Sequence, residues 1–231
     1  MPTTSSAHPG RPHARRSLRF ERRGVLIAVA LAALAVAGPR AEVGAQSSLV
    51  GIAQKSVGTL TVVRTDGVEN YLRGSGSLPL FEGDVLKTAA GSKALVMLRE
   101  GIQVALNEGT TAKLISRWER AKGVTPIIRV GVGEIWAKSS GEAKTLDVET
   151  PAATAFVQEV GQHGIEFTLS VAESGDSTLT VQEGIVGFGT SFGTCPIRAG
   201  TVSFGARGKR CTKPEPFDTR STTAWKQGLV P

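Results

Sequence analysis

The histidines of this sequence leave little room for acid–base or metal chemistry. Of the three histidines, only His163 follows residue 45. Glu159 and Glu166 lie close to it, and a histidine between two carboxylates could hold a metal ion or transfer a proton. However, Glu166 begins an apolar, strand-like run, and the residues before it are rich in glycine. The pattern favours a polar loop histidine, and since no His/Cys cluster has metal-ligand spacing, we predict no metal site.

Paired carboxylates are the next candidates, because two of them across a cleft can hydrolyse a glycosidic bond. Most of those present here stand beside turn residues, where a carboxylate stabilises the local backbone and faces water. The glycine-rich stretch 184–189 resembles a phosphate-binding loop but lacks the helix that should follow it, so we predict a strand there and no bound cofactor. We therefore predict no catalytic residue and no enzyme activity. The carboxylates considered are Asp84, Glu100, Glu134, Asp147 and Glu149.

A basic run near the C-terminal end is the most distinctive surface feature. Arg207, Lys209 and Arg210 precede Cys211, and Lys213 follows it. Cationic side chains grouped on a turn could contact an anionic glycan or an acidic envelope protein. The alternative is a solvated turn that has no partner. We take these four basic residues as the candidate partner-binding loop.

The chain has two cysteines, Cys195 and Cys211. In an exported protein, an even number of cysteines is explained most simply by a disulfide. This disulfide would close a loop of roughly 15 residues and stabilise the fold by about 3 kcal/mol in the chain-entropy model.

The N-terminal region has the three parts of a secretory signal. Six arginines precede an uncharged apolar run, residues 24–38, and small residues follow up to Ala45. The run would form a helix of roughly 22 Å, which is shorter than the hydrocarbon core of about 30 Å. We predict that residues 1–45 are a signal peptide, cleaved after Ala45, and that the protein is periplasmic. The alternative is a retained inner-membrane anchor facing the periplasm, in which case only this segment contacts the membrane.

The net charge of +7 suggests a nucleic-acid binder at first sight, but its location argues against one. Residues 1–45 contain seven of the 27 basic residues and two of the 20 acidic residues. The remainder is nearly balanced, with most of its excess positive charge near the C-terminal end. We therefore predict no nucleic-acid partner.

The elements that must position these residues are β-strands. Short apolar runs rich in β-branched residues alternate with glycine turns, whereas helical patterning is weak. We predict an all-β domain at residues 46–211, formed by a short-stranded sandwich or a β-solenoid, although no repeat of fixed length is visible. Residues 212–231 are expected to lie on the surface or to be flexible, with Phe217 and Trp225 as docking points. The runs are 58–63, 94–98, 102–106, 127–132, 134–137, 166–171, 177–181 and 185–188.

Two tryptophans of the predicted domain could stack on a sugar. Trp136 lies in an alternating apolar run, so we expect it in the core. Trp118 stands between charged residues and is the better candidate for an exposed side chain.

Five segments resemble the FecR domain, the family named for a periplasmic regulator of ferric citrate uptake. Each motif is weak alone, since Gly-Asp and Glu-Gly turns occur in many β proteins, but all five occur in the family order between about residues 58 and 200. They are residues 80–88 (LFEGDVLKT), 92–106 (SKALVMLREGIQVAL), 132–136 (VGEIW), 148–155 (VETPAATA) and 181–186 (VQEGIV).

The resemblance implies an exported domain that recognises other molecules, with some departures from the family pattern. The segment after Val157 is longer than in the family and lacks its arginine. The 23 residues before the apolar run are too few for an anti-sigma domain, and the 20 residues after Cys211 are too few for a transporter-docking domain. We therefore expect a non-enzymatic binding or scaffold module of the bacterial envelope, with a protein or glycan partner. The alternative is a membrane-tethered signalling regulator of the FecR type.

Overall fold

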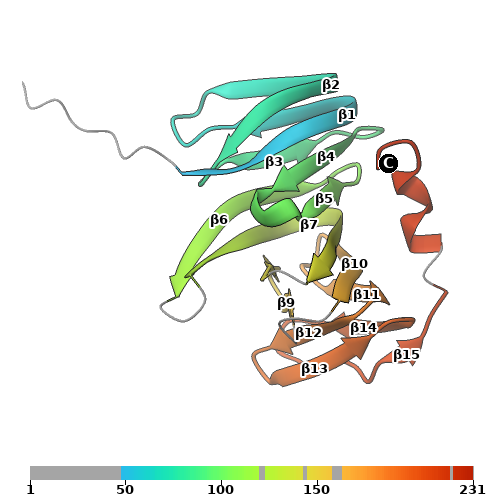
Figure 1. Cartoon of the computed structure of the whole chain (residues 1–231). Coiled ribbons are helices and arrows are strands. Elements are labelled where there is room, and N and C mark those ends of the chain that lie inside the picture. Colours follow the sequence, from blue (N-terminus) through green and yellow to red (C-terminus); the bar gives the residue numbers. More distant parts are fainter. Residues whose placement is uncertain (1–47, 120–122, 143–144, 158–162, 219–220, 231) are drawn as a thin grey trace, which may run out of the picture. The chain divides into compact units, whose positions relative to one another are not determined.

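The computed structural model describes residues 48–119, 123–142, 145–157, 163–218 and 221–230. The predicted signal peptide, residues 1–45, and its cleavage point after Ala45 lie outside the described residues. The described part is almost entirely β-structure (Figure 1). Its strands are β1 Leu49–Val63, β2 Glu69–Phe81, β3 Val85–Thr88, β4 Lys93–Leu98, β5 Gln103–Leu106, β6 Thr111–Glu119, β7 Gly123–Glu142, β8 Asp147–Glu149, β9 Thr154–Val157, β10 His163–Val171, β11 Ser177–Glu183, β12 Ile185–Thr190, β13 Gly193–Arg198, β14 Thr201–Gly205 and β15 Glu215–Pro216; the short 3₁₀ helices are η1 Arg99–Gly101 and η2 Ser221–Lys226.

Six strands close into a barrel. In ring order they are β1, β4, β5, β7, β6 and β3, and each pair of neighbours is antiparallel. Because side chains alternate across a strand, every second residue points into the barrel. In β7, Ile135 and Ala137 join the main core, whereas Trp136 between them faces outward. Strand β2 pairs with the other edge of β1, outside the ring.

The ring closes because its two longest strands bend. Strand β1 pairs with β4 up to Val57 and with β3 from Leu60, and it bends at Gly58, where φ is +70°. Strand β7 pairs with β6 up to Val132 and with β5 from Ile135. Each long strand therefore crosses from one side of the barrel to the other, which two separate short strands could not do.

The bend in β7 requires glycine. At Gly133 φ is +102°, and a Cβ atom there would lie 2.4 Å from Cα of Thr110. The space is filled by Thr110 because its Oγ1 accepts a hydrogen bond from the backbone N–H of Glu134 at 3.0 Å and donates one to the carbonyl of Glu134 at 3.1 Å. The β5–β6 turn is thus fastened to β7 at the point where β7 turns.

The barrel has an approximate two-fold symmetry. Hairpin β3–β4 packs along β1, and hairpin β5–β6 packs along β7 in the same way, with β3 paired to β6 and β4 to β5. At the bend of β1, the hydroxyl of Ser92 in the β3–β4 turn accepts a hydrogen bond from the N–H of Thr59 at 3.1 Å, as Thr110 does for Glu134 in β7. The repeat lies in the strand pairing and not in a period of the sequence.

The second half of the domain is a pair of facing sheets that both start from β7. The N-terminal half of β7 pairs with β8, and β9, β12 and β13 continue that sheet. The C-terminal half of β7 pairs with β10, and β11, β14 and β15 continue the other sheet. Side chains from both sheets share one core; Phe188 of β12 packs so closely on Gly205 of β14 that a Cβ there would lie 3.0 Å from its ring. The two sheets therefore lie face to face.

The structure confirms an all-β fold and corrects its form. The predicted sandwich or solenoid does not describe the first half, which is a closed barrel whose two longest strands, β1 and β7, have 15 and 20 residues. A sandwich describes only the second half. The separate runs 127–132 and 134–137 belong to one bent strand, since Gly133 turns the chain without ending the pairing. The predicted strand within 184–189 is confirmed as β12.

Candidate functional site

The carboxylates considered for catalysis are scattered, and their partners are structural. Asp84 is 1% exposed, pairs with Arg64 and accepts the N–H of Phe81 at 2.7 Å. Asp147 and Glu149 of β8 pair with arginines of the neighbouring strands. Arg117 of β6 lies 3.3 Å from Asp147 and 3.0 Å from Glu149, and Arg129 of β7 lies 2.7 Å from Glu149. The structure therefore brings no open pair of catalytic carboxylates together among these residues. The side chain of Glu100 lies outside the described part.

His163 begins β10, where its backbone pairs with Glu142. Its side chain, that of Trp118 and the loop 158–162 lie outside the described residues, so their predicted roles stay predictions. In the part of the chain that the structure describes, no group of three or more His, Cys, Asp and Glu side chains is arranged to hold a metal ion.

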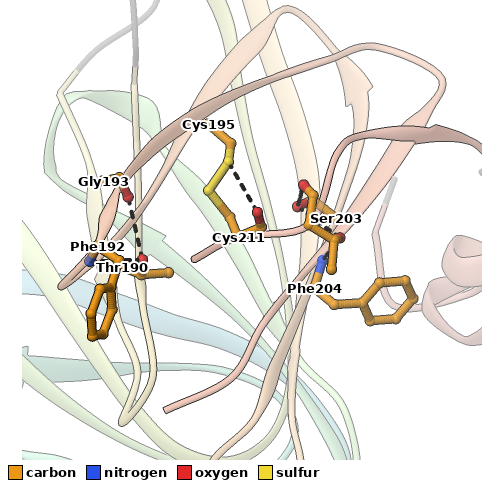
Figure 2. Close-up of a disulfide and its surroundings, with 8 residues drawn as sticks. Thr190, Phe192, Gly193, Cys195, Ser203, Phe204 and Cys211 are labelled. Atoms are coloured by element: carbon orange, nitrogen blue, oxygen red, sulfur yellow. Dashed lines mark hydrogen bonds between the residues drawn. A yellow bond between two sulfur atoms is a disulfide. The ribbon is translucent and has the colours of Figure 1, made fainter. Parts of the chain in front are cut away.

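The cationic loop, residues 206–213, is tied down at its C-terminal side. Cys211 forms a disulfide with Cys195 of β13, with 6.2 Å between their Cα atoms (Figure 2). Next to it, the N–H of Thr212 donates to the carbonyl of Phe204 at 2.9 Å, and the hydroxyl of Ser203 donates to the carbonyl of Thr212 at 2.9 Å. The loop therefore leaves β14, turns, and returns to the same strand.

All four predicted binding residues of the cationic loop, Arg207, Lys209, Arg210 and Lys213, are exposed. The turn itself closes through a hydrogen bond from the N–H of Lys209 to the carbonyl of Ala206 at 3.1 Å. Two neighbouring glycines make room for the guanidinium groups. A Cβ on Gly175 would lie 3.2 Å from Nε of Arg207, and one on Gly193 would lie 3.5 Å from Nη2 of Arg210. Among the described side chains, none of the four makes an ion pair, so their charges are available to a partner.

Apolar surface lies beside the cationic loop. Phe192 is 58% exposed and Phe204 is 49% exposed, and Figure 2 shows them on either side of the disulfide. A mainly apolar hollow of about 380 Å³ opens next to Phe204. It is lined by Val171, Ala172 and Ala206 and also by the polar residues Ser170, Asp176, Ser177 and Thr178. This end of the domain can therefore offer cations and an apolar contact to one ligand.

A second surface was missed by the sequence analysis. The C-terminal segment 221–230, here called the strap, lies across the outer side of the barrel. The surface below it, here called the strap face, consists of outward side chains from five strands. They are Lys55, Lys93, Leu95, Ala105, Glu134, Trp136 and Glu166.

The strap is held by polar and apolar contacts. The indole N–H of Trp225 donates to Oε1 of Glu134 at 2.7 Å, and Nζ of Lys226 donates to Oε1 of Glu166 at 2.6 Å. The Lys226 ammonium also lies 3.8 Å from the centre of the Trp136 ring. Leu229 is 1% exposed and packs on the same tryptophan. Trp136 is buried as predicted, but it is covered by the strap and is not part of the barrel interior.

The alternation of β7 was the signal that could have indicated this face. Ile135 and Ala137 point inward, so Trp136 must point outward, and an outward tryptophan needs a cover. Trp225 docks as expected of it. Phe217, the other expected docking point, is 41% exposed, and its backbone N–H donates to the carbonyl of Gly200 at 2.9 Å.

The pKa values of the two glutamates of the strap face are shifted in opposite directions. Burial alone would raise the pKa of Glu166, but hydrogen bonds from Lys226, Lys138 and Trp136 outweigh it and lower the pKa below its ordinary value. Burial raises the pKa of Glu134, against the opposing effect of the indole hydrogen bond from Trp225. Among the described side chains, cations contact the Glu166 carboxylate and not that of Glu134, which accounts for the difference.

Glu166→Gln is expected to remove a part of the stability that depends on pH. Because the folded-state pKa lies below the unfolded value of about 4.3, this stability is present above that value and is lost as the pH falls through the folded pKa. At pH 7 the variant should be about 1.5–3 kcal/mol less stable, the range for charge-assisted hydrogen bonds. Urea unfolding from pH 7 to pH 3 should show this difference shrinking below about pH 4.

Glu134→Gln is the matched control, since an amide oxygen can still accept the indole N–H. Its folded-state pKa is raised, so ionisation of Glu134 costs stability as the pH rises through that pKa. The variant should be at least as stable as the wild type at pH 7. A Glu166→Gln difference that stays constant down to pH 3 would contradict the assignment.

The described residues form an all-β domain built around a closed barrel, with a sandwich attached. Residues 84–187 of this domain match the family described as FecR protein, so this segment is a FecR domain, as the motifs indicated. No curated protein sequence matches the chain. The described residues contain no helix long and apolar enough to cross a membrane.

Two crystal structures of a "putative anti-sigma factor" from Parabacteroides distasonis ATCC 8503 are similar to this chain. Each shares 19% sequence identity with it, at a TM-score of 0.49. The matches cover 62% of this chain and 65% and 64% of the two crystallised chains. The similarity thus spans less than two thirds of the length of those proteins.

Proposed function

We propose that this chain is an exported, non-enzymatic FecR-type binding module of the bacterial cell envelope, and that its cationic loop recognises an anionic protein or glycan. The observation that carries the proposal is the loop itself. Four cationic side chains are exposed on a turn that a disulfide and two hydrogen bonds to β14 hold in place. A fixed loop on a rigid sheet loses little conformational entropy on binding.

The location of the module rests on two supports. FecR domains are in general periplasmic, and the Cys195–Cys211 disulfide is consistent with an oxidising compartment. The proposal needs no cofactor and no metal, since charge and shape complementarity are enough for recognition. It also needs no membrane contact beyond the N-terminal segment, and that contact only if the segment is retained.

The test is a pull-down of envelope proteins and glycans with the exported chain. The loop variant replaces Arg207, Lys209, Arg210 and Lys213 by glutamine. The control replaces four exposed cations of the first half of the domain by glutamine: Arg73, Lys87, Arg99 and Lys113. We expect the wild type and the control to recover the same partner, the loop variant to recover at least tenfold less, and added salt to weaken the recovery. Equal recovery by both variants, or no partner at all, would contradict the proposal.

A second candidate is a membrane-tethered signalling regulator of the FecR type. It is favoured by the family match at residues 84–187 and by the apolar run 24–38, which would be retained as the anchor. N-terminal sequencing of the mature protein separates the two candidates. A mature chain that begins at Gln46 excludes the tether, whereas an intact N-terminus in the membrane fraction supports it.

A further inference from the structure

We propose that the strap face is a peptide-binding site, that the strap occupies it in cis, and that a segment of a partner protein with the pattern Trp-Lys-x-x-Leu replaces the strap. The contacts of the strap show which chemistry the face accepts. This inference uses a different surface from the cationic loop, so each can fail without the other.

Part of the recognition is directed at the backbone. Nζ of Lys93 donates to the carbonyl of Trp225 at 2.9 Å, and Nζ of Lys55 donates to the carbonyl of Gly228 at 2.7 Å. Any peptide chain has such carbonyls. The two lysines therefore fix the position of an occupant without requiring its sequence.

Three contacts of the strap face recognise side chains of the occupant. Glu134 accepts an indole N–H, Glu166 accepts an ammonium group, and Leu95, Ala105 and Trp136 surround a leucine. If the strap leaves, Glu134 loses its closest donor and Glu166 loses one of two cations. A half-buried carboxylate without its donor is costly. The occupant must therefore bring an N–H donor, then a cation at the next residue, and an apolar side chain three residues later.

The strap fits this surface incompletely. No residue of η2 is buried, and Leu229 is the strap's one fully buried side chain. At the other end of the strap, Nε2 of Gln182 donates to Oγ1 of Thr222 at 3.1 Å, but Oε1 of Gln182 is buried without a partner among the described atoms. A groove of about 550 Å³, lined by Gln103, Lys138 and Gln227 among others, remains open beside the strap. A partner with an extra donor at the Thr222 position would satisfy Gln182 and bind better than the strap.

The test uses the full chain and a labelled peptide with the sequence of residues 221–231, STTAWKQGLVP. Trp225→Ala with Leu229→Ala loosens the strap and leaves the face unchanged. We expect this variant to bind the peptide at least tenfold more tightly than the wild type does. Adding Glu166→Lys to the variant should abolish binding, and a peptide with glutamate in place of Lys226 should restore it.

Hydrogen exchange in β3 and β6, which supply no residue of the strap face, checks that the variants are folded. If the loosened variant does not fold, labelled wild type titrated with excess unlabelled peptide must show the indole N–H signal of its own Trp225 shifting as that side chain leaves Glu134. The proposal is overturned if a folded loosened variant binds no better than the wild type, if the charge-swapped pair does not recover, or if the excess peptide leaves the Trp225 signal unchanged. It is also overturned if the chain forms strap-exchanged dimers, since the occupant would then be a second copy.

Discussion

Gly133→Ala is expected to destabilise the domain by about 3–5 kcal/mol or to prevent folding. An alanine at φ +102° is strained whatever its surroundings. Here the added Cβ would also lie 2.4 Å from Cα and 2.5 Å from Oγ1 of Thr110. The Cα atom is backbone and cannot rotate away, so the β5–β6 turn would have to leave β7 and lose both hydrogen bonds of Thr110 to Glu134.

Gly141→Ala is the control in the same strand. Its φ is +78°, but a Cβ atom there would meet nothing within 4 Å. It should cost only the backbone strain, about 1–2 kcal/mol. Urea unfolding of the two variants and the wild type separates strain from the clash. If the two variants lose the same stability, the bend in β7 does not depend on the contact with Thr110.

Asp84→Ala is expected to have the second-largest effect, a loss of about 3–5 kcal/mol, because it breaks a buried ion pair. Asp84 is 1% exposed, and its carboxylate accepts both the Arg64 guanidinium and the N–H of Phe81. Its backbone is also paired to Leu114 of β6, through the N–H of Leu114 at 2.9 Å. The side chain thus holds the β2–β3 turn at the point where β3 enters the barrel.

Asp66→Ala is the control, because this exposed aspartate also accepts a turn N–H, that of Val68 at 2.9 Å. It should cost no more than about 1 kcal/mol. Arg64→Met combined with Asp84→Leu should be more stable than Asp84→Ala, since the double variant leaves no buried charge unpaired. Thermal unfolding ranks the three proteins, and an Asp84→Ala loss as small as that of Asp66→Ala would refute the role of the pair.

Much of the fold follows from local patterns that a single sequence shows. Alternation and glycine turns were enough for most of the barrel strands, and the turn glycines Gly67, Gly101 and Gly109 all have positive φ. The closure of the barrel does not follow from such patterns. Gly133 has the same signature as a turn glycine, yet it bends one strand that continues to pair on both sides. Whether a glycine ends or bends a strand depends on which hairpin packs against it.

The cationic loop and the strap face also differ in how far the sequence alone predicts them. The cationic loop was predictable because its charges and its cysteine are neighbours in the sequence. The strap was not, since its contacts join residues that are 60, 91 and 173 positions apart. A lysine and a tryptophan near the C-terminal end have no distinctive spacing of their own. Their role becomes visible only in the fold, where Glu134 of β7 and Glu166 of β10 accept hydrogen bonds from them.

The order in which the chain is made affects the strap face. The barrel strands, Trp136 included, are synthesised well before Trp225 and Lys226. Contacts as long-range as that between Lys55 and Gly228 also form late in folding. A chain that forms its barrel before the strap docks would pass through a stage in which the face is bare. A partner segment present at that stage would meet Trp136 without competition from the strap.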